Sequence, residues 1–207
     1  QNYTNLEVIL INDGSTDNTE NILNKISDLD HRVVVINKDN EGIAATRNKG
    51  IELARGEYIT FADNDDWIGI DYIHNLVTAA ISNDSDISIG GFQRVRADGS
   101  VIMTKDTPHT EWGIYCNPTP WAKIYKTSFL RNNDIRFFSY PIGEDIFFIL
   151  SIIANGAKYS FVDNTYYQWF YNEDSISNTI HKGMDKKSDI VPLLNKLNKL
   201  GKDDNEL

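Results

Sequence analysis

The strongest constraint on the fold is a regular alternation of apolar runs and amphipathic segments over residues 6–84. Three short apolar runs have the composition of buried strands, and they cover residues 6–13, 32–37 and 57–63. Each run precedes a segment whose apolar residues recur at helical spacing. These helical segments cover residues 15–30, 41–56 and 69–84. The alternation predicts a parallel sheet with crossover helices, because neighbouring parallel strands need a long connection.

The pattern changes after residue 86. Residues 86–104 indicate two strands joined at "ADGS", which is a hairpin signal. We expect a helix around residues 120–133, a helix over 143–157, an aromatic strand over 157–170 and a polar helix over 187–201. The predicted fold class is therefore α/β, with a mainly parallel Rossmann-like sheet flanked by helices and a small mixed β region.

Composition excludes several classes of function. The formal net charge of −10 argues against a broad surface for nucleic acid or anionic lipid, since both need clustered Lys and Arg. A single cysteine, Cys116, rules out an internal disulfide and favours a reducing compartment such as the cytoplasm. The longest apolar run, residues 146–154, is too short to span a bilayer.

Carboxylates follow two of the predicted strands. Asp13 ends the first strand, and Asp63 and Asp65 end the third. Right-handed crossovers bring the carboxyl ends of parallel strands to one edge of the sheet, so we expect these side chains to converge on one cleft. Carboxylate oxygens are preferred ligands of Mn²⁺ and Mg²⁺, which indicates a site for one of these cations. Solvated turns leading into helices are the alternative interpretation.

Four segments in order closely resemble successive motifs of glycosyltransferase family 2, whose members have the GT-A fold. The segments are "EVILINDGSTDNT", "NEGIAATRNKGIELARGEYITFADNDD", "WAKIYK" and "GEDIFF". The resemblance extends from about residue 6 to residue 177. It implies an inverting enzyme that moves a sugar from a nucleoside-diphosphate-sugar, with a UDP-sugar favoured, to a hydroxyl group. It further implies a glycan or lipid-linked glycan acceptor in surface polysaccharide or cell-wall synthesis.

The same resemblance implies a role for each matching residue. Asp13, Arg47 and Asp63 would contact the nucleotide, and Asp65 would bind the Mn²⁺ or Mg²⁺ ion. Asp145 would be the catalytic base that takes the proton of the acceptor hydroxyl. Simple capping of the first helical turn is the alternative explanation for Asp145.

Four further residues are candidates for contacts with the sugar or the acceptor. Trp121 and Lys123 belong to the "WAKIYK" segment, and Glu144 precedes the proposed base. His181 is the fourth, and it is also a candidate for a metal or phosphate contact, since the region before "SIS" lacks the arginine that many members have there. A solvated loop histidine is the alternative.

We expect residues 1–207 to form a single GT-A-like domain. Residues 1–97 would be its nucleotide-binding half, 98–180 its acceptor-side half and 181–207 a carboxyl-terminal helical segment. The expected location is cytoplasmic, with peripheral association at the inner face of the membrane left open. A non-catalytic module that binds a nucleotide or a divalent cation is the main alternative function. A phosphatase forming an aspartyl-phosphate is disfavoured, because Trp67 stands where such enzymes have Thr or Val.

The amino terminus departs from the family pattern. Members usually open with an apolar strand and a helix that precede the segment matched here by residues 6–13. This sequence starts at "QNYTNLEVIL" and has neither, so we expect either a truncated chain or an incomplete sequence. The sheet should then lack an interior strand, which would leave apolar residues near Val8 and Ile9 unpaired or covered by another segment.

Overall fold

The structure is a computed structural model that describes residues 1–110, 112–139, 143–172 and 195 of the 207-residue chain. The helices are α1 (Thr19–Leu29), α2 (Ile43–Leu53), α3 (Tyr72–Ser82), α4 (Thr127–Asn132), α5 (Glu144–Ala154) and a short 3₁₀ helix, η1 (Gly113–Cys116). The strands are β1 (Val8–Asp13), β2 (Val33–Lys38), β3 (Tyr58–Ile59), β4 (Trp67–Ile68), β5 (Ile87–Val95), β6 (Val101–Lys105), β7 (Lys123–Lys126) and β8 (Tyr159–Phe170).

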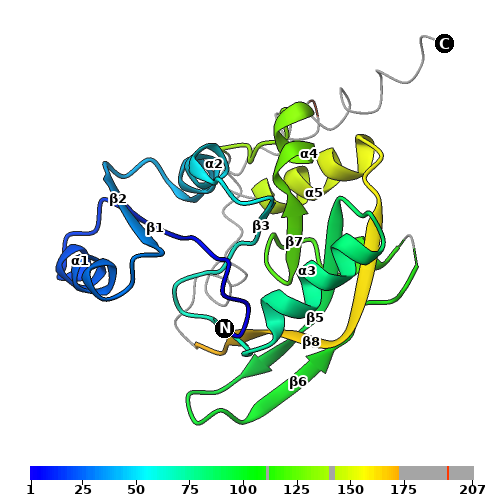
Figure 1. The fold of residues 1–207 in the computed structure, drawn as a ribbon, viewed down its shortest axis with the longest axis horizontal. Helices are drawn as coiled ribbons and strands as arrows, with labels where there is room; N and C mark the ends of the chain where they lie inside the picture. Colours follow the sequence, from blue (N-terminus) through cyan, green and yellow to red (C-terminus); the bar gives the residue numbers. More distant parts are fainter. Residues whose placement is uncertain (111, 140–142, 173–194, 196–207) are drawn as a thin grey trace, which may run out of the picture.

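Strands β1 and β2 form a parallel pair of their own. Val8 lies opposite Val33 at one end, and Asp13 lies opposite Lys38 at the other. In Figure 1 this pair and α1 form one side of the molecule, well apart from the long strands β5, β6 and β8. The predicted strand–helix–strand order of the first 53 residues is therefore confirmed.

The second sheet has six strands in the order β3-β7-β5-β8-β4, with β6 paired to the outer part of β5. Among the described strands of this sheet, only β5 and β8 run parallel; the other pairings are antiparallel. The expectation of a mainly parallel sheet is therefore wrong. The physical reason is β7, which inserts antiparallel between β3 and β5 and pairs Tyr125 with Ile59 on one side and with Ile87 on the other.

The predicted helix over residues 120–133 is also only partly correct. Its first half is β7, and α4 begins at Thr127. Ile124 and Tyr125 are almost fully buried and lie in an extended strand between two neighbours, so packing overrides their helical context. The predicted hairpin is confirmed, since the N–H of Arg96 donates to the carbonyl of Ser100 at 3.0 Å between β5 and β6.

Within the described part of the chain, the two sheets do not join. No described strand pairs with the second edge of β1, and a groove of about 650 Å³ lies between β1 and the segment around β3. Ile9 and Ile11 line it from one side, and Ile59 and Phe61 from the other. The expected interruption of the sheet beside Val8 is confirmed within the described residues.

Two apolar clusters hold the second sheet in place. In one, Phe61 packs edge-on against Tyr125, Phe137 and Phe148, which anchors the segment after β3. In the other, α3 covers β5 and β8 through a cluster that includes Tyr167.

The expected helix over residues 187–201 lies outside the described residues apart from Asn195. No helix in the described part of the chain is long and apolar enough to cross a membrane.

Candidate active site

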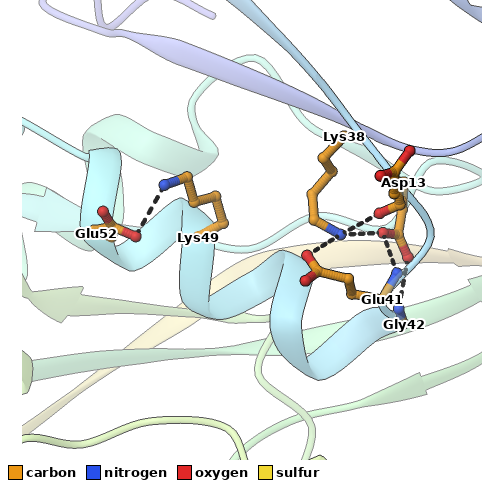
Figure 2. A network of polar contacts seen from close by, with 7 residues as sticks. Asp13, Lys38, Glu41, Gly42, Lys49 and Glu52 are labelled. Carbon is orange, nitrogen blue, oxygen red and sulfur yellow. Dashed lines mark hydrogen bonds and ion pairs between the residues drawn. The ribbon is translucent and has the colours of Figure 1, made fainter.

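Asp13 organises the turn that leads into α2. Its carboxylate accepts hydrogen bonds from the ammonium group of Lys38 and from the backbone N–H groups of Glu41, at 3.0 Å, and Gly42, at 2.9 Å (Figure 2). Burial alone would raise the pKa of Asp13, but these hydrogen bonds outweigh it and hold the pKa below its usual value. Asp13 therefore fixes the start of the helix that carries Arg47.

Arg47 contacts two carboxylates that come from different parts of the sequence. Its Nη1 donates to Oδ1 of Asp145 at 2.6 Å, and its Nη2 lies 3.2 Å from Oδ1 of Asp63. The Arg47 side chain is only 9% exposed, and its guanidinium group lies over the ring of Phe137, 5.3 Å from the centroid. A buried guanidinium is fixed in place by such contacts, so Arg47 sets the distance between the acidic segment after β3 and the start of α5.

Asp145 is the second residue of α5. The helix begins directly after Gly143, whose φ of +96° is readily adopted only by glycine. Burial raises the pKa of Asp145 to about 6; the charge of Arg47 opposes this rise, and those of Glu144 and Asp63 add to it. Within the described residues, its second oxygen, Oδ2, has no hydrogen-bond partner. The geometry leaves a carboxylate near neutral pKa with one oxygen able to take a proton.

Residues 60–66, here called the acidic loop, connect β3 to β4. Asp65 is exposed, and among the described residues its carboxylate makes no hydrogen bond or ion pair. No group of three or more metal-binding side chains occurs in the described part of the chain. Ions such as Mg²⁺ are commonly held by one or two carboxylates together with phosphate oxygens of a ligand, so Asp65 could supply one ligand to such an ion.

Sequence reasoning missed Asp66, the last carboxylate of the loop. Its Oδ2 accepts a hydrogen bond from the hydroxyl of Tyr167 at 2.7 Å, and its Oδ1 accepts one from the N–H of Phe170 at 2.8 Å. Burial raises the pKa of Asp66 to about 6. The run of acidic residues indicated a functional loop. No feature of the sequence showed that Asp66 would be hydrogen-bonded to β8 while Asp65 is exposed.

The four weaker candidates lie in different settings. Lys123 is fully buried, and its ammonium group donates to the carbonyls of Asn117, Thr119 and Trp121 at 2.7, 2.9 and 3.3 Å. Burial lowers the pKa of Lys123 to about 7, and the charge of Asp145 opposes this shift. Trp121 is 7% exposed and stacks on Tyr167. Both side chains therefore lie within the packed interior.

Glu144 and His181 complete the set of candidates. Glu144 is partly exposed in the first turn of α5, next to Asp145, where the helix dipole favours a negative charge. His181 lies outside the described residues. The structure thus brings together Arg47, Asp63 and Asp145 among the predicted site residues.

Comparison with known proteins decides the family. Residues 1–147 match the family described as Glycosyl transferase family 2. The chain belongs to this family. It is 27% identical to glycosyltransferase GlyA of Streptococcus pneumoniae, over 94% of this chain and 31% of that protein. It is 33% identical to poly(ribitol-phosphate) beta-glucosyltransferase of Bacillus spizizenii, over 78% of this chain and 27% of that protein.

A solved structure also resembles the fold of this chain. S. aureus TarS 1–349, crystallised in complex with UDP-GlcNAc, gives a TM-score of 0.70 at 24% identity, covering 84% of this chain and 52% of TarS. This likeness supports the GT-A-like fold that the sequence motifs implied. The chain spans less than a third of GlyA and of the Bacillus enzyme, and about half of the TarS fragment.

Proposed function

We propose that the chain carries the donor site and the catalytic base of an inverting glycosyltransferase that uses a UDP-sugar and Mn²⁺ or Mg²⁺. The observation that carries this proposal is the contact of Arg47 with both Asp145 and Asp63. Through this contact, a single guanidinium group connects Asp145, whose pKa is about 6, to the acidic loop. Family membership and the UDP-GlcNAc complex of TarS support the choice of a sugar nucleotide as donor.

The chemistry needs one base on one face of the sugar. Asp145 takes the proton of the acceptor hydroxyl through its free Oδ2, and the hydroxyl oxygen forms a bond to the anomeric carbon. The bond between that carbon and the diphosphate oxygen breaks, and the nucleoside diphosphate leaves with the electron pair. Since attack and departure occur on opposite faces, a single displacement inverts the anomeric centre.

Asp65 is the residue that we propose for the cation. Its exposed carboxylate would supply one ligand, and diphosphate oxygens would supply others. A divalent cation held there would stabilise the negative charge that gathers on the diphosphate as the sugar bond breaks. Asp13, Arg47 and Asp63 are the residues proposed to surround the nucleotide, and in the structure they hold α2 and the acidic loop in position.

We further propose that residues 1–97 bind the nucleotide and residues 98–180 face the acceptor, within a single domain. The proposed acceptor is a glycan or lipid-linked glycan of surface polysaccharide or cell-wall synthesis, on the cytoplasmic side of the membrane. Support comes from the relatives, one of which is named for glucosyl transfer to poly(ribitol-phosphate). Trp121, Lys123 and Glu144 lie on the proposed acceptor side, where buried Lys123 would act through the loop it holds.

Turnover of the donor tests the proposal. The chain is incubated with a panel of UDP-sugars, with Mn²⁺ or with a chelator, and the release of UDP is measured. We expect Mn²⁺-dependent release from one UDP-sugar, because transferases lose some sugar to water. Mn²⁺-dependent binding of UDP without any release, even with glycan acceptors present, would instead support the non-catalytic binding module.

A further inference from the structure

The hydroxyl group of Tyr167 bridges two residues of the acidic loop. It donates to Oδ2 of Asp66 at 2.7 Å, and it accepts a hydrogen bond from the backbone N–H of Asp63 at 2.9 Å. The second oxygen of Asp66 accepts from the N–H of Phe170 at 2.8 Å. Three hydrogen bonds thus attach the acidic loop to β8. The side chains that take part are Asp66 of the loop and Tyr167 of the strand.

Tyr167 is itself rigidly held. It has no exposed surface, and its ring stacks on Trp121 with centroids 4.8 Å apart and planes 10° apart. Its backbone lies in β8 between two strands, opposite Phe92 of β5 and Ile68 of β4. The position of the hydroxyl oxygen is therefore fixed by β8. The acidic loop is thus held by a regular strand and not by another loop.

The three carboxylates of the acidic loop differ in their contacts with the rest of the described structure. Asp66 uses both oxygens on β8, and Asp63 contacts Arg47. Asp65 alone among these three has no protein partner in the described part of the chain. Like charges so close in sequence repel one another, so a loop without fixed donors would spread them apart. The contacts made by Tyr167 and Phe170 oppose that spreading and engage both oxygens of Asp66.

We propose that Tyr167 and Asp66 are positioning residues of the donor site, which hold the acidic loop so that Asp63 and Asp65 present their carboxylates together to the nucleotide and its cation. The inference rests on the proposed function. It assigns neither residue to the chemistry itself. Loss of the bridge should therefore weaken the binding of UDP with Mn²⁺ and leave the step performed by Asp145 largely intact.

Tyr167→Phe removes the hydroxyl group and keeps the ring that stacks on Trp121. The matched control is Tyr166→Phe on the same strand, because the hydroxyl of Tyr166 donates to Asp106 at the same distance of 2.7 Å and, among the described residues, makes no hydrogen bond to the acidic loop. Asp66→Asn is the second variant. Its amide can still accept from Phe170, but it would have to donate to the Tyr167 hydroxyl, which reverses that hydrogen bond.

Hydrogen exchange tests the bridge without any ligand. The backbone amide of Asp63 is followed by NMR in the chain and in the three variants. We expect exchange at Asp63 to be at least about tenfold faster in Tyr167→Phe, because the partly buried hydrogen bond of this amide is lost, and unchanged in Tyr166→Phe. Equal exchange in Tyr167→Phe and in the unaltered chain would overturn the bridge as a constraint on the loop.

Binding and turnover test its consequence. We expect Tyr167→Phe and Asp66→Asn to raise the Kd for UDP in the presence of Mn²⁺ by about tenfold, and to change kcat for UDP-sugar hydrolysis less than threefold. An unaltered Kd in Tyr167→Phe would overturn the positioning role while the proposed function stands. If the unaltered chain binds no UDP at all, the proposed function fails together with this inference.

Discussion

Arg47 and Asp145 are 98 positions apart in the sequence, and the guanidinium group of the first donates to the carboxylate of the second at 2.6 Å. Burial raises the pKa of this carboxyl group to about 6, although the positive charge beside it opposes the shift. The balance leaves Asp145 ionised at neutral pH and still able to accept a proton, which is the condition that a general base must satisfy.

The pH dependence of activity should reflect this balance. We expect kcat/KM for UDP-sugar hydrolysis to be level above about pH 7 and to fall below about pH 6, because protonated Asp145 cannot accept a proton. Unfolding should not cause the fall. A raised carboxyl pKa means that the folded state binds this proton more tightly than the unfolded state, so protonation of Asp145 adds stability as the pH falls from 7 to 5. Activity that stays level down to pH 5 would contradict the assignment.

Replacement of Arg47 should shift the pH dependence of kcat/KM. Arg47→Gln removes the charge that favours ionised Asp145, so the acid limb of kcat/KM should move to higher pH by roughly one unit. Lys49→Gln is the control, since Lys49 lies on the same helix and pairs with Glu52 on the surface. A limb that moves equally in both variants, or in neither, would show that Arg47 does not set the pKa of the base.

Asp65→Asn should abolish the effect of the metal and preserve the fold. The residue is exposed and has no partner in the described structure, so its replacement costs little stability. We expect Mn²⁺ no longer to raise the unfolding temperature in the presence of UDP. Asp28→Asn, which alters an exposed carboxylate on α1, serves as the control. Mn²⁺-dependent stabilisation that survives in Asp65→Asn would place the cation elsewhere.

Lys123 should matter for stability. Lys123→Met keeps a long apolar stem but leaves three buried or partly buried carbonyl groups without their donor. We expect the free energy of unfolding in urea to fall by about 2–4 kcal/mol. Lys49→Met, at a side chain that is 39% exposed, should change it by less than about 0.5 kcal/mol. Equal stability of the two variants would mean that the carbonyl groups find other partners.

Local patterns predicted the elements of this fold better than their pairing. The helix after Gly143 and the strand ending at Phe170 follow from apolar periodicity and β-forming composition. The strand at Ile124 could not be distinguished from a helix, because its extended form depends on β3 and β5 on either side. The family motifs likewise named Arg47 and Asp145 separately, and only the folded chain brings them into contact.

The direction and burial of the site side chains could not be predicted from local sequence either. Asp65 and Asp66 are chemically identical neighbours in the sequence, yet one is exposed and the other bonds to Tyr167. Lys123 belongs to a family motif that suggested contact with substrate, yet its ammonium group is saturated by backbone carbonyls. Side-chain direction in a loop depends on which strand packs beside it, and that information is not local.

The role of Asp145 is the central claim, and one pair of variants tests it most directly. Asp145→Asn keeps the size of the side chain but cannot accept the proton, so the rate of sugar transfer should fall by about 10²–10⁴-fold while the Kd for UDP with Mn²⁺ changes little. Glu144→Gln, one residue earlier in α5, should have the milder effect. Near-normal transfer by Asp145→Asn, together with loss of transfer in Glu144→Gln, would contradict the assignment of the base.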